Sequence, residues 1–91
     1  MHAETVEQAH FERDVRGFIV NNFLFGQPLE LEADESLLRK GVIDSTGVLE
    51  LVAFLEEQYA IKVEDDEVVP ENLDSIRNVA AYLSRKLTNR S

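Results

Sequence analysis

Apolar side chains recur at spacings of three and four residues in three segments of the chain, which is the repeat of an α-helix with one buried face. The first predicted helix covers about residues 6–24, and Gly26 and Pro28 just beyond it favour its termination. The second covers about residues 45–58. The third starts at residue 74 or 75 and continues to about residue 87. Each predicted helix has one apolar stripe, so the helices must pack against one another.

Two other segments connect these helices. Residues 27–44 form a long irregular stretch that is too apolar for a free linker, so we expect a loop held across the core, with a short turn at 35–39. Residues 70–73 are typical of one short helical turn, with Pro70 at a favourable first position. The order predicts an all-α fold: a small four-helix bundle of three main helices plus one short helix, with a long loop between the first two.

The length and composition restrict the class of protein. A chain of 91 residues suits one domain, which we expect over residues 1–91 with its core at about 6–87. The absence of cysteine excludes disulfides, Cys-ligated zinc and thiol nucleophiles. No signal pattern and no apolar stretch of membrane-spanning length are found in the sequence. We therefore expect a cytoplasmic protein, monomeric and not inserted in a membrane.

The charge balance is strongly acidic, with 18 acidic against 9 basic residues and a net charge of −9. A negative field of this kind repels nucleic acid and attracts proteins with basic patches, although it also serves solubility alone. The acidic run at residues 64–67 lacks the spaced ligands and the glycine of a calcium loop, and we expect a solvated face there rather than a metal site. His2 and His10 have no convincing partner and receive no role.

The segment with the clearest chemistry is Gly-Val-Ile-Asp-Ser-Thr-Gly at residues 41–47. Asp44 precedes Ser45 where the long loop becomes the second helix. The free N–H groups and the positive dipole end of a helix favour a phosphate on a serine placed there. The alternative is that Ser45 only caps the helix. A second pair, Asp74-Ser75, also precedes a helix, and we expect Ser75 to act as an N-cap and not as a modified residue.

Several segments together resemble the acyl carrier protein family over about residues 6–87: those around Asp34–Leu38, Gly41–Ser45, Leu55–Glu57, Ile61–Val63 and Pro70–Ile76. The resemblance implies a 4′-phosphopantetheine arm on Ser45, with Asp44 as the supporting acid. It also implies a phosphopantetheinyl transferase, an acyl or aminoacyl ligase or transferase, and downstream biosynthetic enzymes as partners. The cargo would be carried as a thioester, and the protein itself would not be an enzyme and would have no catalytic residue.

This sequence departs from common fatty-acid-synthesis carriers, which place a leucine after the serine and a glycine three residues before it. Here Thr46 follows Ser45 and Gly41 lies four residues before it. This form is more similar to D-alanyl carrier proteins and other carriers loaded by adenylating ligases. The cargo therefore stays open between fatty acyl, short acyl and amino acid groups.

The second helix is the family's main docking surface for partner enzymes. Its polar face is expected to carry Thr46, Gly47, Glu50, Ala53 and Glu57. The docking residues we predict are Thr46, Leu49, Glu50, Ala53 and Glu57. Two other functions remain as alternatives: a non-covalent acidic helical adaptor without a prosthetic group, and a small hydrolase using Ser45, for which no general base lies near in the sequence.

Overall fold

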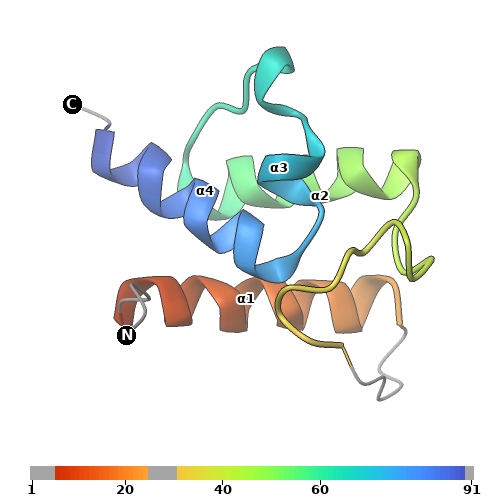
Figure 1. The fold of residues 1–91 in the computed structure, drawn as a ribbon. Coiled ribbons are helices and arrows are strands. Elements are labelled where there is room, and N and C mark those ends of the chain that lie inside the picture. Colours follow the sequence, from red (N-terminus) through yellow and green to blue (C-terminus); the bar gives the residue numbers. More distant parts are fainter. Residues whose placement is uncertain (1–5, 25–30, 90–91) are drawn as a thin grey trace.

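Four α-helices and one 3₁₀ turn make up the regular structure of residues 6–24 and 31–89, the part of the chain that this computed structural model describes (Figure 1). They are α1 Val6–Asn22, α2 Ser45–Tyr59, the 3₁₀ turn η1 Asp65–Glu67, α3 Pro70–Leu73 and α4 Ile76–Asn89. These described residues contain no strand. The predicted all-α bundle, with three long helices and one short one, is confirmed. None of the helices described is long and apolar enough to cross a membrane.

The helix boundaries differ from the predicted ones by one or two residues. Helix α1 ends at Asn22, although the N–H groups of Phe23 and Leu24 still donate to the Ile19 carbonyl at 2.9 and 3.2 Å. The predicted stop at Gly26 and Pro28 lies outside the described residues. Helix α4 begins at Ile76, one residue after the serine that we expected to cap it. Frayed ends of this kind depend on local hydrogen bonds that periodicity does not report.

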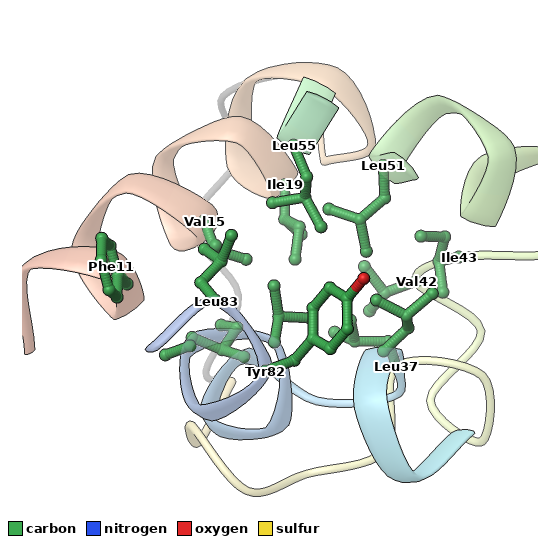
Figure 2. Packing of buried hydrophobic residues seen from close by; sticks show 14 of the residues in the cluster. Phe11, Val15, Ile19, Leu37, Val42, Ile43, Leu51, Leu55, Tyr82 and Leu83 are labelled. Carbon is green, nitrogen blue, oxygen red and sulfur yellow. The ribbon is translucent and has the colours of Figure 1, made fainter. Parts of the chain in front are cut away.

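The core lies where the apolar stripes of the long helices meet (Figure 2). Val15 and Ile19 of α1, Leu51 and Leu55 of α2, and Leu83 of α4 have no exposed surface. Burying a side chain of this size contributes roughly 1.5–3 kcal/mol. Helix α4 packs along α1 and against α3. The predicted stripes therefore face one another, and their burial holds α2 with its first turn at the surface.

The loop before α2 contributes side chains to the same core (Figure 2). In its described part, the side chains of Leu37, Val42 and Ile43 are buried. The Leu37 carbonyl accepts the N–H groups of Val42 and Ile43 at 3.0 and 3.3 Å, which folds the chain back on itself. Gly41 makes this possible with a φ of +73°, a left-handed conformation that other residues adopt with strain. The predicted loop held across the core is confirmed for residues 31–44.

Candidate functional site

Asp44 caps helix α2. Its backbone is extended, with φ −119° and ψ −172°, and its carboxylate Oδ1 accepts the backbone N–H of Gly47 at 2.8 Å. Its carbonyl accepts the N–H of Val48 at 2.9 Å. An aspartate at this position satisfies one of the free amide groups of the first turn and adds a negative charge at the positive end of the helix. The cap is therefore provided by the acid and not by the serine that follows it.

Ser45 is the first residue of α2, and it is exposed. Its hydroxyl shares no hydrogen bond with any residue that the structure describes. The backbone N–H groups of Ser45 and Thr46 likewise have no acceptor within that part of the chain, while that of Gly47 is taken by Asp44. Two open N–H groups and the helix dipole favour an anion at this position. The site thus offers a free hydroxyl beside a place for a phosphate.

Gly47 is the one residue of the predicted exposed face that the structure buries. A Cβ at this position would lie 2.5 Å from Ile43 Cγ1 and 2.9 Å from Phe23 Cε1. The placement on the polar face was wrong because a helical repeat does not show what the preceding loop does. Here Ile43 turns back under the first turn of α2, and only a glycine leaves room for it.

The other residues predicted on the docking face are exposed along α2, which leads away from Ser45: Thr46, Leu49, Glu50, Ala53 and Glu57. Glu50 and Glu57 form no ion pair within the described residues. Leu49 is 66% exposed. A single exposed leucine is ordinary at a protein surface, so its interest here is that it lies on the same exposed face as Glu50 and Ala53.

Leu38 is a surface residue that the sequence did not single out. It lies in the loop before α2 and is 44% exposed, while its neighbour Leu37 is fully buried. Leu38, Val48, Val69 and Leu73 line an apolar pocket of about 130 Å³ that also touches Asp74. Val48 lies three residues after Ser45, so this pocket opens at the same end of α2. The only sequence signal for an exposed Leu38 was that two leucines are adjacent in a loop, where a turn can bury just one of them.

The second Asp-Ser pair lies at the junction between α3 and α4. Ser75 is 4% exposed, and its hydroxyl accepts the N–H of Asn78 at 3.0 Å. The prediction that it caps the helix is confirmed. The carboxylate of Asp74 instead accepts a hydrogen bond from the Ser36 hydroxyl and one from the N–H of Leu38 at 2.9 Å. Ser75 is therefore buried with its hydroxyl engaged in the cap, whereas Ser45 is exposed with its hydroxyl free of the described residues.

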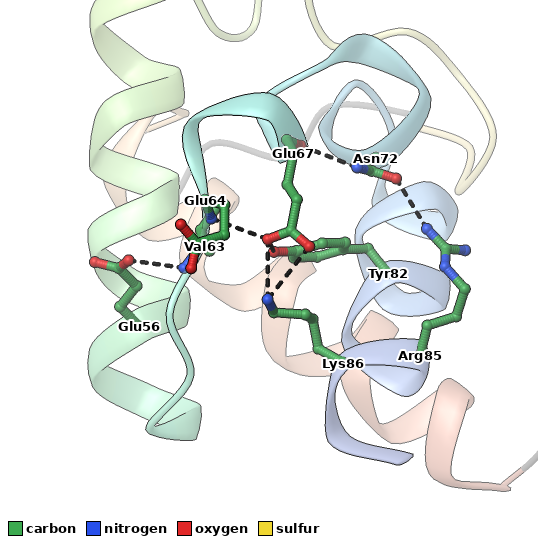
Figure 3. A network of polar contacts seen from close by, with 8 residues as sticks. All are labelled: Glu56, Val63, Glu64, Glu67, Asn72, Tyr82, Arg85 and Lys86. Atoms are coloured by element: carbon green, nitrogen blue, oxygen red, sulfur yellow. Dashed lines mark hydrogen bonds and ion pairs between the residues drawn. The ribbon is translucent and has the colours of Figure 1, made fainter. Parts of the chain in front are cut away.

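A cleft of about 600 Å³ with a mixed polar and apolar lining lies near the C-terminal end of α2, where it is lined in part by Ala60, Glu67, Tyr82 and Lys86. Figure 3 shows Glu67 at the centre of the hydrogen bonds in this cleft. Its carboxylate accepts the Tyr82 hydroxyl at 2.9 Å and lies 2.9 Å from Lys86 Nζ. The backbone N–H of Glu64, foremost, and then Lys86 and Tyr82 lower the pKa of Glu67 against partial desolvation.

The acidic run at residues 64–67 is therefore not uniformly solvated as predicted. Glu64, Asp65 and Asp66 are exposed, but Glu67 is half-buried. Burial of the Tyr82 hydroxyl, together with its bond to Glu67, raises the pKa of Tyr82. The residues that the structure describes form no group of three or more His, Cys, Asp or Glu side chains able to hold a metal ion.

Comparison with known proteins gives a consistent set of relatives, although no family model matches the chain. An acyl carrier protein of Bdellovibrio bacteriovorus is 30% identical over 65% of this chain and 73% of its own length. A D-alanyl carrier protein of Abiotrophia defectiva is 30% identical over 62% of this chain and 71% of its own length. The probable acyl carrier protein PigG of a Serratia species is 25% identical over 74% and 77%.

The fold is also found in a solved structure. It is described as the crystal structure of an FAD-dependent dehydrogenase, and the matching chain in it is 30% identical, with a TM-score of 0.67. The similarity covers 76% of this chain and 97% of that one. Since three quarters of 91 residues span nearly all of it, that chain is shorter than this one.

Proposed function

Because the chain belongs to the acyl carrier protein family, we propose that it carries its cargo as a thioester on a 4′-phosphopantetheine arm attached to Ser45. Its relatives are carrier proteins rather than enzymes, and this chain is likewise a carrier and not an enzyme. We propose further that residues 1–91 form one carrier domain that works as a monomer.

The free hydroxyl of Ser45 is the observation that carries this proposal. Asp44 occupies the cap position through Gly47, so Ser45 stands inside the first turn of α2, exposed and without a hydrogen bond to the described residues. A phosphodiester there would meet the open N–H groups of Ser45 and Thr46 without needing a basic side chain. The supporting role of Asp44 is then to shape the turn.

Attachment of the arm is a transfer from coenzyme A by a partner transferase. The Ser45 Oγ–phosphorus bond forms, the pyrophosphate bond of coenzyme A breaks, the adenosine bisphosphate half leaves, and the serine proton passes to the transferase. The arm supplies a terminal thiol, which holds an acyl or aminoacyl group as a reactive thioester. The chain itself presents the serine, seats the phosphate and keeps the tethered group at high effective concentration near its enzymes.

The surface around Ser45 supports docking of these enzymes. Two exposed leucines, Leu38 and Leu49, flank the start of α2, and Glu50 and Glu57 follow along the exposed face. An apolar contact with an acidic margin suits a partner that presents an apolar patch ringed by Lys or Arg. We propose that the phosphopantetheinyl transferase, the ligase that loads the arm, and the downstream enzymes approach this face through Thr46, Leu49, Glu50, Ala53 and Glu57.

A flavin dehydrogenase is one class of downstream partner that the comparisons favour. The chain that shares this fold in the dehydrogenase structure is shorter than 91 residues. Dinucleotide-binding folds are built on parallel strands, and the described residues of this chain contain none. This chain would therefore act as substrate carrier and not as the flavin protein. Such a partner would oxidise the tethered group, and its flavin would supply the acceptor for the two hydrogen atoms removed.

The test is the mass of the intact protein after incubation with coenzyme A and a phosphopantetheinyl transferase of broad specificity. We expect one phosphopantetheine addition to the wild type and to Ser75→Ala, and no addition to Ser45→Ala. Circular dichroism provides the folding control. Addition to Ser45→Ala would overturn the assignment of the site. An unmodified wild type would instead favour the non-covalent adaptor, because that function needs no prosthetic group.

A further inference from the structure

Asp74 joins two parts of the chain that lie far apart in the sequence. Its carboxylate Oδ2 accepts the Ser36 hydroxyl, 38 residues away, and its Oδ1 accepts the N–H of Leu38, 36 residues away, at 2.9 Å. Its backbone carbonyl accepts the N–H of Leu37 at 2.7 Å. Three consecutive loop residues are thus held by one residue at the α3–α4 junction. A carboxylate with two acceptor oxygens suits this contact, because each oxygen serves a different donor.

These bonds lead directly to the segment that presents Ser45. The Ser36 hydroxyl, oriented by Asp74, also accepts the N–H of Arg39 at 3.0 Å, which closes the turn. The carbonyl of Leu37 then accepts the N–H groups of Val42 and Ile43. Ile43 is the residue that lies under Gly47 in the first turn of α2. The position of this first turn therefore depends on a loop whose start is fixed by Asp74.

We propose that Asp74 is a positioning residue for the reactions at Ser45. It acts through the 36–43 loop and touches neither the arm nor the cargo. Through Ser36 and Leu38 it holds the loop so that Ser45 stands free at the start of α2 and Leu38 stays exposed beside it. This inference rests on the proposed attachment of the arm to Ser45. Asp74, the acid of the second Asp-Ser pair, would thus position Ser45, the serine of the first pair.

The neighbouring Ser75 offers a matched control. Asp74 and Ser75 lie at the same junction, but Ser75 bonds forward to Asn78 in α4, whereas Asp74 bonds back to the loop. Ser75→Ala weakens α4 without touching the loop. Asp74→Ala releases the loop. Any effect on Ser45 that follows from lower stability alone would be shared by both variants, and an effect of positioning would belong to Asp74→Ala.

The experiment measures kcat and KM of a phosphopantetheinyl transferase for the full chain with coenzyme A, at a temperature where each variant is folded. We expect Asp74→Ala to lower kcat/KM about tenfold, mostly in kcat, since a small displacement of a reacting group has effects of this size. Ser75→Ala should stay within about twofold of wild type. Ser36→Ala should fall between them, and Asp74→Asn, which keeps one acceptor oxygen for Leu38, should recover most of the rate.

Hydrogen exchange of single amides gives a second measurement that does not depend on the transferase. In Asp74→Ala the N–H groups of Leu38 and Ile43 should exchange faster, and in Ser75→Ala they should not. Equal kcat/KM for Asp74→Ala, Ser36→Ala and wild type would overturn the positioning role while the proposed function stands. If Asp74→Ala does not fold, Ser36→Ala decides the same question, since a kcat/KM equal to that of wild type would overturn the positioning role. An unmodified wild type would mean that the proposed function itself is wrong.

Discussion

The same two residues, Asp-Ser, stand before α2 and before α4, and the structure uses them in opposite ways. At residues 44–45 the acid caps the helix and the serine is exposed. At residues 74–75 the serine caps the helix and is buried, and the acid turns back to the loop. In both cases the cap accepts the N–H group three residues later. The two pairs differ in where the helix begins: α2 begins at the serine of its pair, Ser45, whereas α4 begins one residue after its serine, at Ile76.

This shift has a cause in the residues that follow each pair. Ile76, directly after Ser75, has no exposed surface, so the chain enters α4 already inside the core. Thr46, directly after Ser45, is exposed, and the first buried residue of α2 is Gly47. Ser75 thus lies next to a buried isoleucine and is itself buried, whereas Ser45 is followed by an exposed threonine and is itself exposed. The motif alone therefore does not identify an attachment site.

The largest difference in stability between the two pairs is expected for substitutions of the residue three positions after each cap, Gly47 and Asn78. Gly47→Ala would place a methyl group 2.5 Å from Ile43 Cγ1, so that the loop or the first turn of α2 must move. Overpacking of this kind costs typically about 1–3 kcal/mol of the free energy of unfolding. At the second pair, Asn78→Ala should cost less, since alanine keeps the backbone N–H that bonds to Ser75.

Urea denaturation of both variants measures this difference. The modification rate of Ser45 should also fall in Gly47→Ala, because the displaced turn carries the serine. If Gly47→Ala is as stable as wild type, then the close packing between α2 and the loop is not present in solution.

A smaller difference in stability is expected between the variants of the two serines. Ser75→Ala removes the cap of α4 and should lower the free energy of unfolding by about 1 kcal/mol. Ser45→Ala removes a hydroxyl without a partner in the described residues and should stay within about 0.5 kcal/mol of wild type. Asp44→Ala should resemble Ser75→Ala, because Asp44 provides the cap of α2. Chemical denaturation of the three variants tests this. A loss of about 1 kcal/mol in Ser45→Ala would mean that Ser45, and not Asp44, caps α2.

The sequence predicted the helices well because each long helix buries one stripe and repeats it over several turns. It also predicted the short α3 from Pro70 and the cap at Ser75. These features depend on residues close in sequence, whose spacing is visible without the fold. The sequence did not decide whether the Ser45 hydroxyl caps α2 or is left free, because Asp44 and Ser45 are equally suited to cap a helix.

What the sequence did not reveal depends on contacts between distant segments. Gly47 lies on the polar face of the repeat but is buried by Ile43, which the loop folds underneath it. Glu67 belongs to an acidic run, and only the packing of α4 brings Tyr82 and Lys86 to it. Asp74 likewise meets its loop partners more than 30 residues away. No local pattern distinguishes these acids from their solvated neighbours.

Charge on the exposed face of α2 should affect encounter with partners and not folding. Glu50 and Glu57 are seven residues apart, about two turns, and both are exposed. We expect Glu50→Lys with Glu57→Lys to slow modification of Ser45 several-fold, since each rim pair contributes about 0.2–1 kcal/mol. The effect should shrink as salt rises, because screening at ~0.15 M acts over ~8 Å.

The measurement is the modification rate of wild type and double variant across a salt series, with circular dichroism as the folding control. A matched control is Asp65→Lys with Asp66→Lys, which reverses two exposed charges in η1 and leaves α2 unchanged. Equal rates for wild type and the α2 variant at low salt would show that this face does not steer the transferase. A slower rate in the Asp65→Lys, Asp66→Lys variant would then assign the steering to the acidic run at residues 64–67.

The smallest expected effect concerns pH on the side of the molecule where α4 packs. The pKa of Glu67 is lowered from its ordinary value of 4.5 by the Glu64 N–H, foremost, and by Lys86 and Tyr82. A carboxyl whose folded pKa lies below its unfolded one stabilises the fold above the unfolded value, and this contribution is lost as the pH falls through the folded pKa. Glu67→Gln should therefore lower the free energy of unfolding near neutral pH and have little effect in acid.

The difference between wild type and Glu67→Gln should stay below about 1 kcal/mol, because the Lys86 pair is partly open to solvent. Urea denaturation at several pH values from neutral down to below 4.5 measures it, and Glu71→Gln, an exposed acid on the next turn, controls for net charge. A pH-independent difference would mean that Glu67 acts through packing and not through its charge. The expected uses of the acidic groups thus differ: the exposed carboxylates along α2 would serve encounter with partners, whereas Glu67, held by Lys86 and Tyr82, would serve the fold.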